Sequence, residues 1–389
     1  MTSFFRPFRN RDALLAAVFL LLTLGLLLVP TGFEERVDPA TVRCEGEVLR
    51  VDNDQIQRFG LIAAGDQEVV MRLADGPFKG REVSAQNTLL GQMDRDEIFE
   101  PGDRAFVVLK LDAAGEIGTV NTQGHYRIGL ELLLLGMFSL ALLAFGGWTG
   151  VKALLSFVFS GVVLWKVLVP GLLRGLDPVW LSLGVVTLLT AAIVYLVAGP
   201  TRKGTVAFLG AFLGVLASCL LAVYFTGRFH VHAAVMPFAE TLLYSGFAHL
   251  NLRELFIAAI FLASSGAVMD LAMDVAASMA EVVRKKPDIG HLEAVGSGLR
   301  VGRAVVGTMT TTLLLAYSGG YVTLLMAFMA QGVALPNTFN LIYVAAEALK
   351  TLVGSFGLVL VAPFTAVVGA VLYVGGERKR AERAKDLPV

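Results

Sequence analysis

Long apolar runs dominate the chain and are interrupted by one polar segment. The first run spans residues 13–29, and the others lie at 129–145, 153–170, 179–198, 205–226, 255–283, 354–374 and from near Ala304 onward. Most runs reach the ~20 residues that a helix needs to cross a ~30 Å hydrocarbon core. The pattern predicts a polytopic α-helical membrane protein with about eight transmembrane helices.

Residues 32–128 form the polar segment and follow a different pattern. Short stretches rich in Val and Leu alternate with turn signals. Two of these signals contain both Gly and Pro, namely Asp-Gly-Pro at 75–77 and Pro-Gly-Asp at 101–103. Four strands are predicted, at 42–52, 68–73, 81–86 and 105–111. We therefore expect a small all-β domain, inserted after the first helix, with a five-stranded OB-like barrel as its fold.

Composition supports the membrane class. Of 389 residues, 56% are hydrophobic and only 16% are charged, against about 25% charged in soluble domains. The net charge of zero conceals an asymmetry, because residues 34–128 hold about 18 acids and about 11 bases. The basic residues elsewhere flank apolar runs, so they indicate membrane topology and not a nucleic-acid surface.

Basic clusters predict the orientation. They comprise Arg6, Arg9 and Arg11; Arg202 and Lys203; Arg284, Lys285, Lys286, Arg300 and Arg303; and Arg378, Lys379, Arg380, Arg383 and Lys385. With eight crossings every cluster lies on the cytoplasmic side, as do both termini, and the acidic β domain lies outside. A signal peptide is the alternative for the first run, but its length and the lack of an A-x-A site favour an uncleaved anchor.

The expected organisation has four parts. They are an N-terminal membrane anchor helix (1–31), an extracytoplasmic β domain (32–128), a multi-helix membrane domain (129–376) and a basic cytoplasmic tail (377–389). Residues 304–353 are too long for one crossing. A helix interrupted at Gly319 and Gly320, followed by a re-entrant or interfacial piece, fits the count. The alternative is a hairpin of two short helices with the tail outside, against which the basic tail argues.

Acidic residues recur at helical spacing within the run 255–283. Asp270, Asp274 and Glu281 share one face of the predicted helix. Counted from Leu255 at 1.5 Å per residue, Asp270 lies about 22 Å deep, Asp274 near the cytoplasmic interface and Glu281 beyond it. A carboxyl group inside the hydrocarbon core is costly and usually marks an ion or proton path. A structural hydrogen bond to another helix is the alternative.

The following helices supply further polar candidates. Thr308, Thr311 and Thr312 could form a polar path with Asp270, or their hydroxyls could bond their own helix backbone. Glu347 and Lys350 are a possible secondary polar pair, and at i,i+3 spacing they are expected to neutralise each other.

Signals for other chemistry are weak. The pair His230 and His232 has no Cys or carboxylate at ligand spacing, so no metal site is expected. The chain carries no P-loop, H-E-x-x-H or G-x-S-x-G motif, and neither a cofactor nor enzymatic activity is expected. Cys44 and Cys219 are not expected to form a disulfide, and Cys44 is interpreted as a buried strand residue.

Several segments resemble the YibE/F-like family of bacterial multipass membrane proteins. They are residues 76–83 with Asn87, 101–103, 266–281, 306–314 with Ala316, and 354–360 with Pro363 and Thr365. The resemblance implies a location in the bacterial cytoplasmic (inner) membrane and favours a permease, without a defined activity.

A fainter resemblance links Gly266–Asp270 and Thr308–Thr312 to proton-driven exporters of the RND and SecD/SecF type, an analogy of fold. The leading hypothesis is a transporter or export-type permease, coupled to protons through Asp270. The rival is a membrane sensor or scaffold whose β domain binds an envelope partner, and an intramembrane enzyme comes third. The expected partners are the lipid bilayer and an unidentified small molecule or envelope protein, and no nucleic acid.

Overall fold

The computed structural model describes residues 10–36 and 38–385, so Arg6 and Arg9 lie outside the described residues. The chain divides into two compact units. One is Gly32–Ala141, and the other combines Met1–Thr31 with Leu142–Val389. Each unit is described below by itself.

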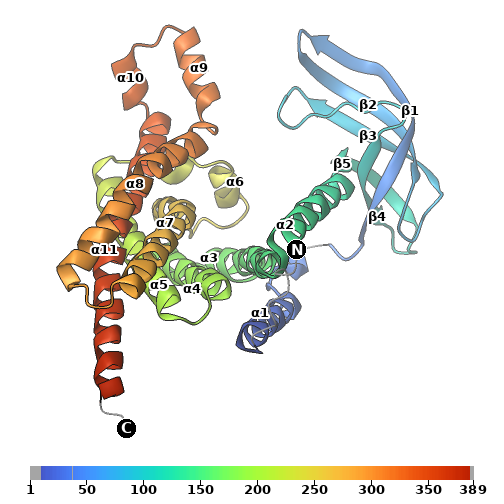
Figure 1. Ribbon diagram of the computed structural model, residues 1–389. Coiled ribbons are helices and arrows are strands. Elements are labelled where there is room, and N and C mark those ends of the chain that lie inside the picture. Colours follow the sequence, from blue (N-terminus) through green and yellow to red (C-terminus); the bar gives the residue numbers. More distant parts are fainter. Residues whose placement is uncertain (1–9, 37, 386–389) are drawn as a thin grey trace. The chain divides into compact units, whose positions relative to one another are not determined.

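The smaller unit contains a five-stranded antiparallel sheet that is nearly closed (Figure 1). The strand order is β3-β2-β1-β4-β5, and β3 also contacts β5. The strands are β1 (Thr41–Phe59), β2 (Ile62–Leu73), β3 (Glu82–Leu90), β4 (Arg104–Leu111) and β5 (Ile117–His125). Alternate residues of the strands face a core that includes Val48, Val69, Met71, Phe99, Val107 and Leu109.

Three strands are longer than predicted, because β1 ends at Phe59, β2 begins at Ile62 and β3 ends at Leu90, and a fifth strand was not predicted. β1 continues to Phe59 because its polar second half pairs with β2 across a two-residue turn at Gly60, which has a φ of 65°. β5 was not predicted, because Asn, Gly, Gln and His have little strand preference. It forms because it pairs with β4 at the end of the sheet. Both differences show tertiary pairing overriding local composition.

Helices make up the larger unit, and the first part of α2 belongs to the smaller one. The main ones are α1 (Asn10–Leu28), α2 (Ile128–Val163), α4 (Pro178–Ala198), α5 (Arg202–Arg228), α7 (Leu252–Lys285), α8 (His291–Ser318) and α11 (Ile342–Lys385). Shorter pieces are η2 (Leu164–Leu168), α3 (Val169–Leu173), η3 (Ala233–Val235), α6 (Ala239–Tyr244), α9 (Val322–Ala330) and α10 (Leu335–Asn340), while η1 (Glu34–Arg36) lies in the smaller unit.

Five helical segments of the described chain are long and apolar enough to span a membrane. They are Ile128–Leu173, Pro178–Ala198, Arg202–Arg228, Leu252–Lys285 and Ile342–Gly375. A sixth is formed if α8 and α9, which are bent by 66°, count as one broken span. The apolar part of α1, Asp12–Leu28, is shorter. These helices identify the chain as a membrane protein.

The 46-residue segment Ile128–Leu173 is not one straight helix. Gly147 has φ 51° and ψ −127°, a conformation outside the helical region that glycine tolerates. Beyond it, a Cβ on Gly150 would overlap the carbonyl oxygen of Leu142. Eight residues of straight helix would separate these two by about 12 Å, so the chain reverses direction at Gly147.

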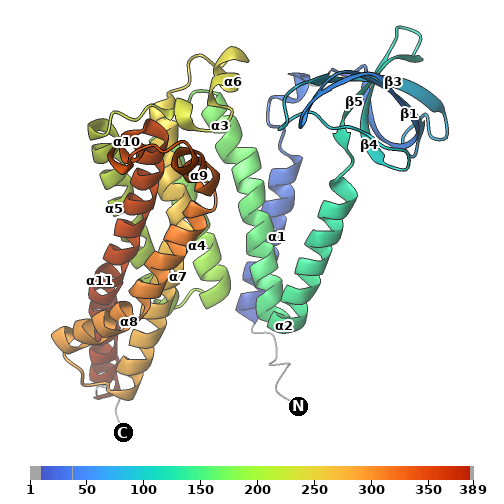
Figure 2. The same cartoon turned by 90° about the horizontal axis from the view of Figure 1, so that it is seen from above.

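Helices α5, α7, α8 and α11 pack into one bundle (Figure 2). Glycines bring the helices together, as in membrane proteins whose helices meet through small residues. On α5, a Cβ at Gly214 would come within 2.9 Å of Val361 on α11, and one at Gly210 would overlap Thr365. On α8, one at Gly302 would approach Ala362 at 2.5 Å.

The last helices differ from their predicted bounds. α8 begins at His291 and not near Ala304, because residues 291–303 form an amphipathic helical start that buries Ala294, Gly298 and Gly302 while exposing Arg300 and Arg303. α11 begins at Ile342 and not at 354, and continues to Lys385. Charged residues within both helices hid these starts from a search for apolar runs. The interruption expected at Gly319 and Gly320 is confirmed, with α8 ending at Ser318.

Candidate functional site

Helix α7 lies at the centre of the helical unit, because α4, α5, α8 and α11 all contact it. It begins after Asn251, whose side-chain oxygen accepts a hydrogen bond from the backbone N–H of Glu254 at 3.3 Å. One side of the helix is buried against its neighbours, and includes Phe261, Ser264, Val268, Leu271 and Val275.

Asp270 and Asp274 lie on another side of α7, which is exposed. Ala263 and Gly266 share this side and are exposed too. Neither carboxylate makes a hydrogen bond or ion pair with another residue in the described part of the chain. The bundle therefore directs two unpaired acids one turn apart towards its surroundings.

Close contacts define the register of α7 against the antiparallel α8. A Cβ on Gly298 would lie 2.6 Å from the sulfur of Met279, and one on Gly302 would lie 3.9 Å from Val275. Because the two helices are antiparallel, each residue further along α8 is level with a residue one position earlier on α7. By this register Gly307 is level with Asp270 and Arg303 is level with Asp274.

Glu281 lies at the charged end of α7. Its carboxylate accepts from Arg284 at 2.7 Å, and the Lys285 ammonium lies 3.8 Å away. Asp270, Asp274 and Glu281 thus follow one another from the apolar part of the helix to its charged end, and only Glu281 has charged partners.

Thr308, Thr311 and Thr312 of α8 are exposed, and each hydroxyl donates to its own helix backbone. Thr308 donates to the Val305 carbonyl at 2.9 Å, Thr311 to Gly307 at 3.1 Å and Thr312 to Thr308 at 3.0 Å. This is the local bonding common for threonine in helices. No hydrogen bond joins the described threonines to Asp270, so any polar path would need water between them.

Thr308 and Thr312 nevertheless lie on the flank of α8 nearer to α7. Tyr317 marks the opposite flank, since its hydroxyl would lie 3.4 Å from a Cβ on Gly354 of α11. At 100° per residue, Thr308 and Thr312 point away from that direction. Thr308 is level with Met269, so it and Asp270 lie on neighbouring helices at the same height.

Glu347 and Lys350 form the predicted pair, with Oε1 and Nζ 2.6 Å apart and both side chains about a quarter exposed. Their position separates them from Asp270. Gly354 of α11 packs on Ser264 at 3.1 Å, and Gly369 packs on Met279 at 3.0 Å. This register puts Glu347 level with Ile257, about 20 Å along the bundle from Asp270.

Buried polar atoms close to this pair were not singled out from the sequence. The Tyr317 hydroxyl and the Thr351 hydroxyl are both buried without a hydrogen-bond partner. Thr351 lies one turn after Glu347 on α11. A tyrosine immediately before the Ser-Gly-Gly break was the available sequence signal, since an intramembrane tyrosine normally finds a partner for its hydroxyl.

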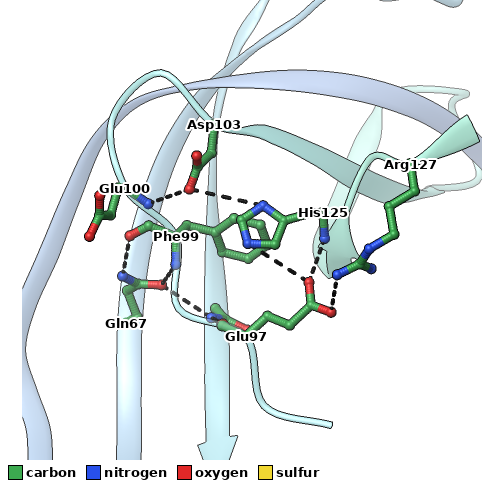
Figure 3. A network of polar contacts seen from close by, with 8 residues as sticks. Gln67, Glu97, Phe99, Glu100, Asp103, His125 and Arg127 are labelled. Carbon is green, nitrogen blue, oxygen red and sulfur yellow. Dashed lines mark hydrogen bonds and ion pairs between the residues drawn. The ribbon is translucent and has the colours of Figure 1, made fainter. Parts of the chain in front are cut away.

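The β domain holds a buried amide network (Figure 3). The Gln67 side chain is completely buried. Its Nε2 donates to Asn53 Oδ1 at 2.8 Å and to the Phe99 carbonyl at 2.9 Å, and its Oε1 accepts from the Phe99 N–H at 3.0 Å. Asn87 also donates to Oε1 at 3.1 Å. One glutamine thus fixes the segment before β4 onto β2.

Glu97 extends this network to the start of α2. Its carboxylate accepts from the His125 N–H and from the Arg127 guanidinium, both at 2.7 Å (Figure 3). Burial raises the pKa of Glu97, but the hydrogen bonds from Arg127 and His125 outweigh it and hold the pKa below its usual range. Arg127 directly precedes α2, so the network ties the end of β5 to the helix that follows.

Replacing Gln67 by Leu should strongly destabilise the β domain. Leucine keeps the volume but leaves the N–H and C=O of Phe99 without partners in the core, and each buried unsatisfied group costs ~1–3 kcal/mol. We expect a loss of about 3 kcal/mol, or about 15 °C in Tm for a domain of this size. Thermal unfolding of a fragment spanning 32–127, followed by circular dichroism, measures it.

Gln86→Leu is the matched control for this experiment, because Gln86 is exposed on β3. It should change the Tm by no more than a few degrees. Equal losses in the two variants would show that the buried network does not stabilise the domain. A fragment with a helical or unfolded spectrum would show that the β domain does not fold alone.

The remaining candidates show no site. Burial, and secondarily the Asp75 carboxylate, raises the pKa of the Cys44 thiol to about 11, which leaves it unreactive near neutral pH. Within the described residues, no group of three or more His, Cys, Asp or Glu side chains could hold a metal ion. His230 contacts the Arg228 carbonyl at 3.0 Å.

Comparison with protein families gives one finding. The family model described as YibE/F-like protein matches residues 134–375, which is more than half of the chain and includes α7, α8 and the bundle part of α11. Comparison with curated proteins and with solved structures gives no match.

Proposed function

Because the chain belongs to the YibE/F-like family, we propose that it is an export-type membrane transporter in which Asp270 carries protons. The observation that supports this most is the pair Asp270 and Asp274, left without a charged partner on a central helix of an apolar bundle. On insertion scales an aspartate at the centre of a membrane helix costs ~2.5–3.5 kcal/mol. Such a cost indicates a functional role.

Proton coupling requires a carboxyl group that can bind and release a proton as its surroundings change. Among the described residues, no basic side chain forms an ion pair with Asp270 that would lock it in the charged form. The exposed Thr308, one helix away and at the same height, could bridge to it through water. Glycines let the helices of the bundle pack closely against each other, which leaves no room for a polar path between them. Such a path could therefore run along the outward side of α7.

Transport can be tested in everted membrane vesicles that hold a proton gradient. Compounds are first chosen by the sensitivity of a deletion strain. Adding one of them should collapse part of the gradient in vesicles that contain the chain, and leave it intact in vesicles that lack it. If no compound to which the deletion strain is sensitive disturbs the gradient, the transporter proposal is wrong.

A second function has its own observation. A hollow of about 530 Å³ in the β domain is lined by Asp52, Asp54, Gln55, Asp66, Glu68, Ser84, Ala85 and Gln86. Its acids favour a cationic envelope partner. In this alternative the chain is a membrane sensor or scaffold, and vesicles would show no compound-dependent change. The strand order, with β3 against β5, supports an OB-type barrel for this domain.

The proposed topology has eight crossings. α1 gives one, the two arms of α2 on either side of Gly147 give two, α4, α5 and α7 give three, the bent pair α8–α9 one and α11 one. An even number puts both termini on one side. The basic clusters at Arg202 and Arg284 then fall on that side too, which is the cytoplasmic one.

Cysteine labelling tests this topology. Native Cys44 and Cys219 are buried and should give little background. A cysteine introduced at Ala113, in the exposed turn between β4 and β5, should react from outside with an impermeant maleimide. Ala381→Cys should react only after the membrane is opened. Labelling of Ala381→Cys in intact cells would contradict the eight-crossing arrangement.

A further inference from the structure

Two exposed faces of the bundle match each other in height and in character. On α7 the face consists of Ala263, Gly266, Asp270 and Asp274, and on α8 of Arg300, Ala304, Gly307 and Thr311, all of them exposed. Successive members are three or four residues apart, so each set forms a stripe along its helix.

The two stripes put small residues of one helix at the level of polar residues of the other. By the contacts of Gly298 with Met279 and Gly302 with Val275, Gly266 is level with Thr311 and Gly307 is level with Asp270. Arg300 is level with Ala277, one turn from Asp274. At each height a small residue on one helix stands at the level of a larger or charged one on the other.

The described residues cover neither stripe. None of their atoms lies within 4 Å of a Cβ built on Gly266 or on Gly307, apart from the local helix backbone. Asp274 and Arg300 have no ion-pair partner among the described residues. Opposite charges directed outwards at nearly the same height, beside open glycines, are suited to a closely approaching helix.

We propose that a second copy of the chain covers these stripes in a two-fold dimer. A two-fold axis along the membrane normal keeps every residue at its own height and makes the interface self-complementary. The α7 stripe of each copy then packs against the α8 stripe of the other in the register described above. The partner's Arg300 reaches Asp274, and the partner's Gly307 lies opposite Asp270.

The charges identify the occupant as a second copy. Facing lipid, Asp274 and Arg300 would both stay unpaired at the cytoplasmic edge of the membrane, where a charge without a partner is costly. In the dimer, Asp274 of each copy lies near the height of Arg300 of the other copy. The interface therefore contains two such ion pairs. This dimer does not depend on transport, because the same charges need covering in a scaffold.

Cysteine cross-linking between differently tagged full-length chains tests the dimer. Gly266→Cys in one copy and Thr311→Cys in the other should form a disulfide when the two are expressed together. Leu220→Cys, an exposed position on α5, is the control and should give only background cross-linking. Cross-linking of the Gly266 and Thr311 pair at the level of this control would overturn the proposal.

Charge reversal tests the pairing itself, on the background of the same cysteine pair. Asp274→Arg or Arg300→Asp alone should lower the cross-linked fraction about tenfold, which is the effect of losing about one partly buried ion pair. The double variant Asp274→Arg with Arg300→Asp should restore it. If either charge reversal prevents folding, Asp274→Asn and Arg300→Gln are used in its place. The cross-linked fraction should then fall by a smaller factor. Cross-linking that no variant changes would contradict the pairing.

Discussion

Replacing Asp270 by Asn is expected to abolish the activity while the protein stays inserted and folded. Asparagine keeps the size of the side chain but cannot titrate, and Asp270 makes no hydrogen bond in the described chain whose loss would unfold the bundle. General acid–base groups contribute ~10²–10⁴-fold, so the transport rate should fall at least about 100-fold. Complementation of a deletion strain at matched expression gives the measurement.

Two variants on the same helix face serve as controls. Asp274→Asn should have a smaller effect, because Asp274 lies one turn nearer the charged end of α7. Glu281→Gln should have almost none, since Glu281 already pairs with Arg284 at 2.7 Å. Full complementation by Asp270→Asn would show that Asp270 is a packing residue. Degradation of Asp270→Asn, with the controls intact, would favour a structural role.

Replacing Gly214 by Leu is expected to disrupt the bundle. A Cβ at this position would lie 2.8 Å from Val268 on α7 and 2.9 Å from Val361 on α11. Both neighbours are β-branched and cannot swing away. Overpacking of a core typically costs ~1–3 kcal/mol, and leucine adds three further carbons beyond Cβ. Heating the purified protein in detergent and measuring the surviving monodisperse fraction should show a markedly lower midpoint.

Gly184→Leu is the matched control for Gly214→Leu. Gly184 lies inside α4, is exposed, and has no atom near its Cβ position. In a membrane-facing helix this change should leave the midpoint unaltered or slightly higher. A midpoint for Gly214→Leu as high as that of Gly184→Leu would show that α5 does not pack as closely as described.

The apolar runs predicted most of the helices because uncharged stretches of about 20 residues have few other folds. Prediction failed where charges lie within a helix. Arg300 and Arg303 hid the first three turns of α8, and Glu347 with Lys350 hid the start of α11. In both helices the charged side chains lie on an exposed or paired side, which depends on neighbouring helices and not on local composition.

The β domain shows the same limit. The turn signal at 75–77 located the β2–β3 hairpin, but β5 depends on pairing with β4 across the sheet. Glutamine is usually a surface residue. Gln67 is buried because its side chain bonds the backbone N–H and C=O of Phe99, which is far away in the sequence. The pattern of polar and apolar residues in a single sequence does not reveal such a long-range partner.

For the candidate site, helical spacing correctly put Asp270 and Asp274 on one face. It could not tell whether that face meets another helix or points outwards, because orientation is set by the glycine contacts of α5, α8 and α11. It also could not locate the secondary polar pair relative to Asp270, whereas the bundle register puts Glu347 about 20 Å along the bundle from it.

Infrared difference spectroscopy on the protein in lipid follows the protonation of the Asp270 carboxyl group itself. A carboxylic C=O band should appear and disappear as the pH is changed, in the wild type and in Asp274→Asn. The same band should be missing from Asp270→Asn. Identical pH-dependent spectra from the wild type and Asp270→Asn would contradict the claim that Asp270 binds and releases a proton.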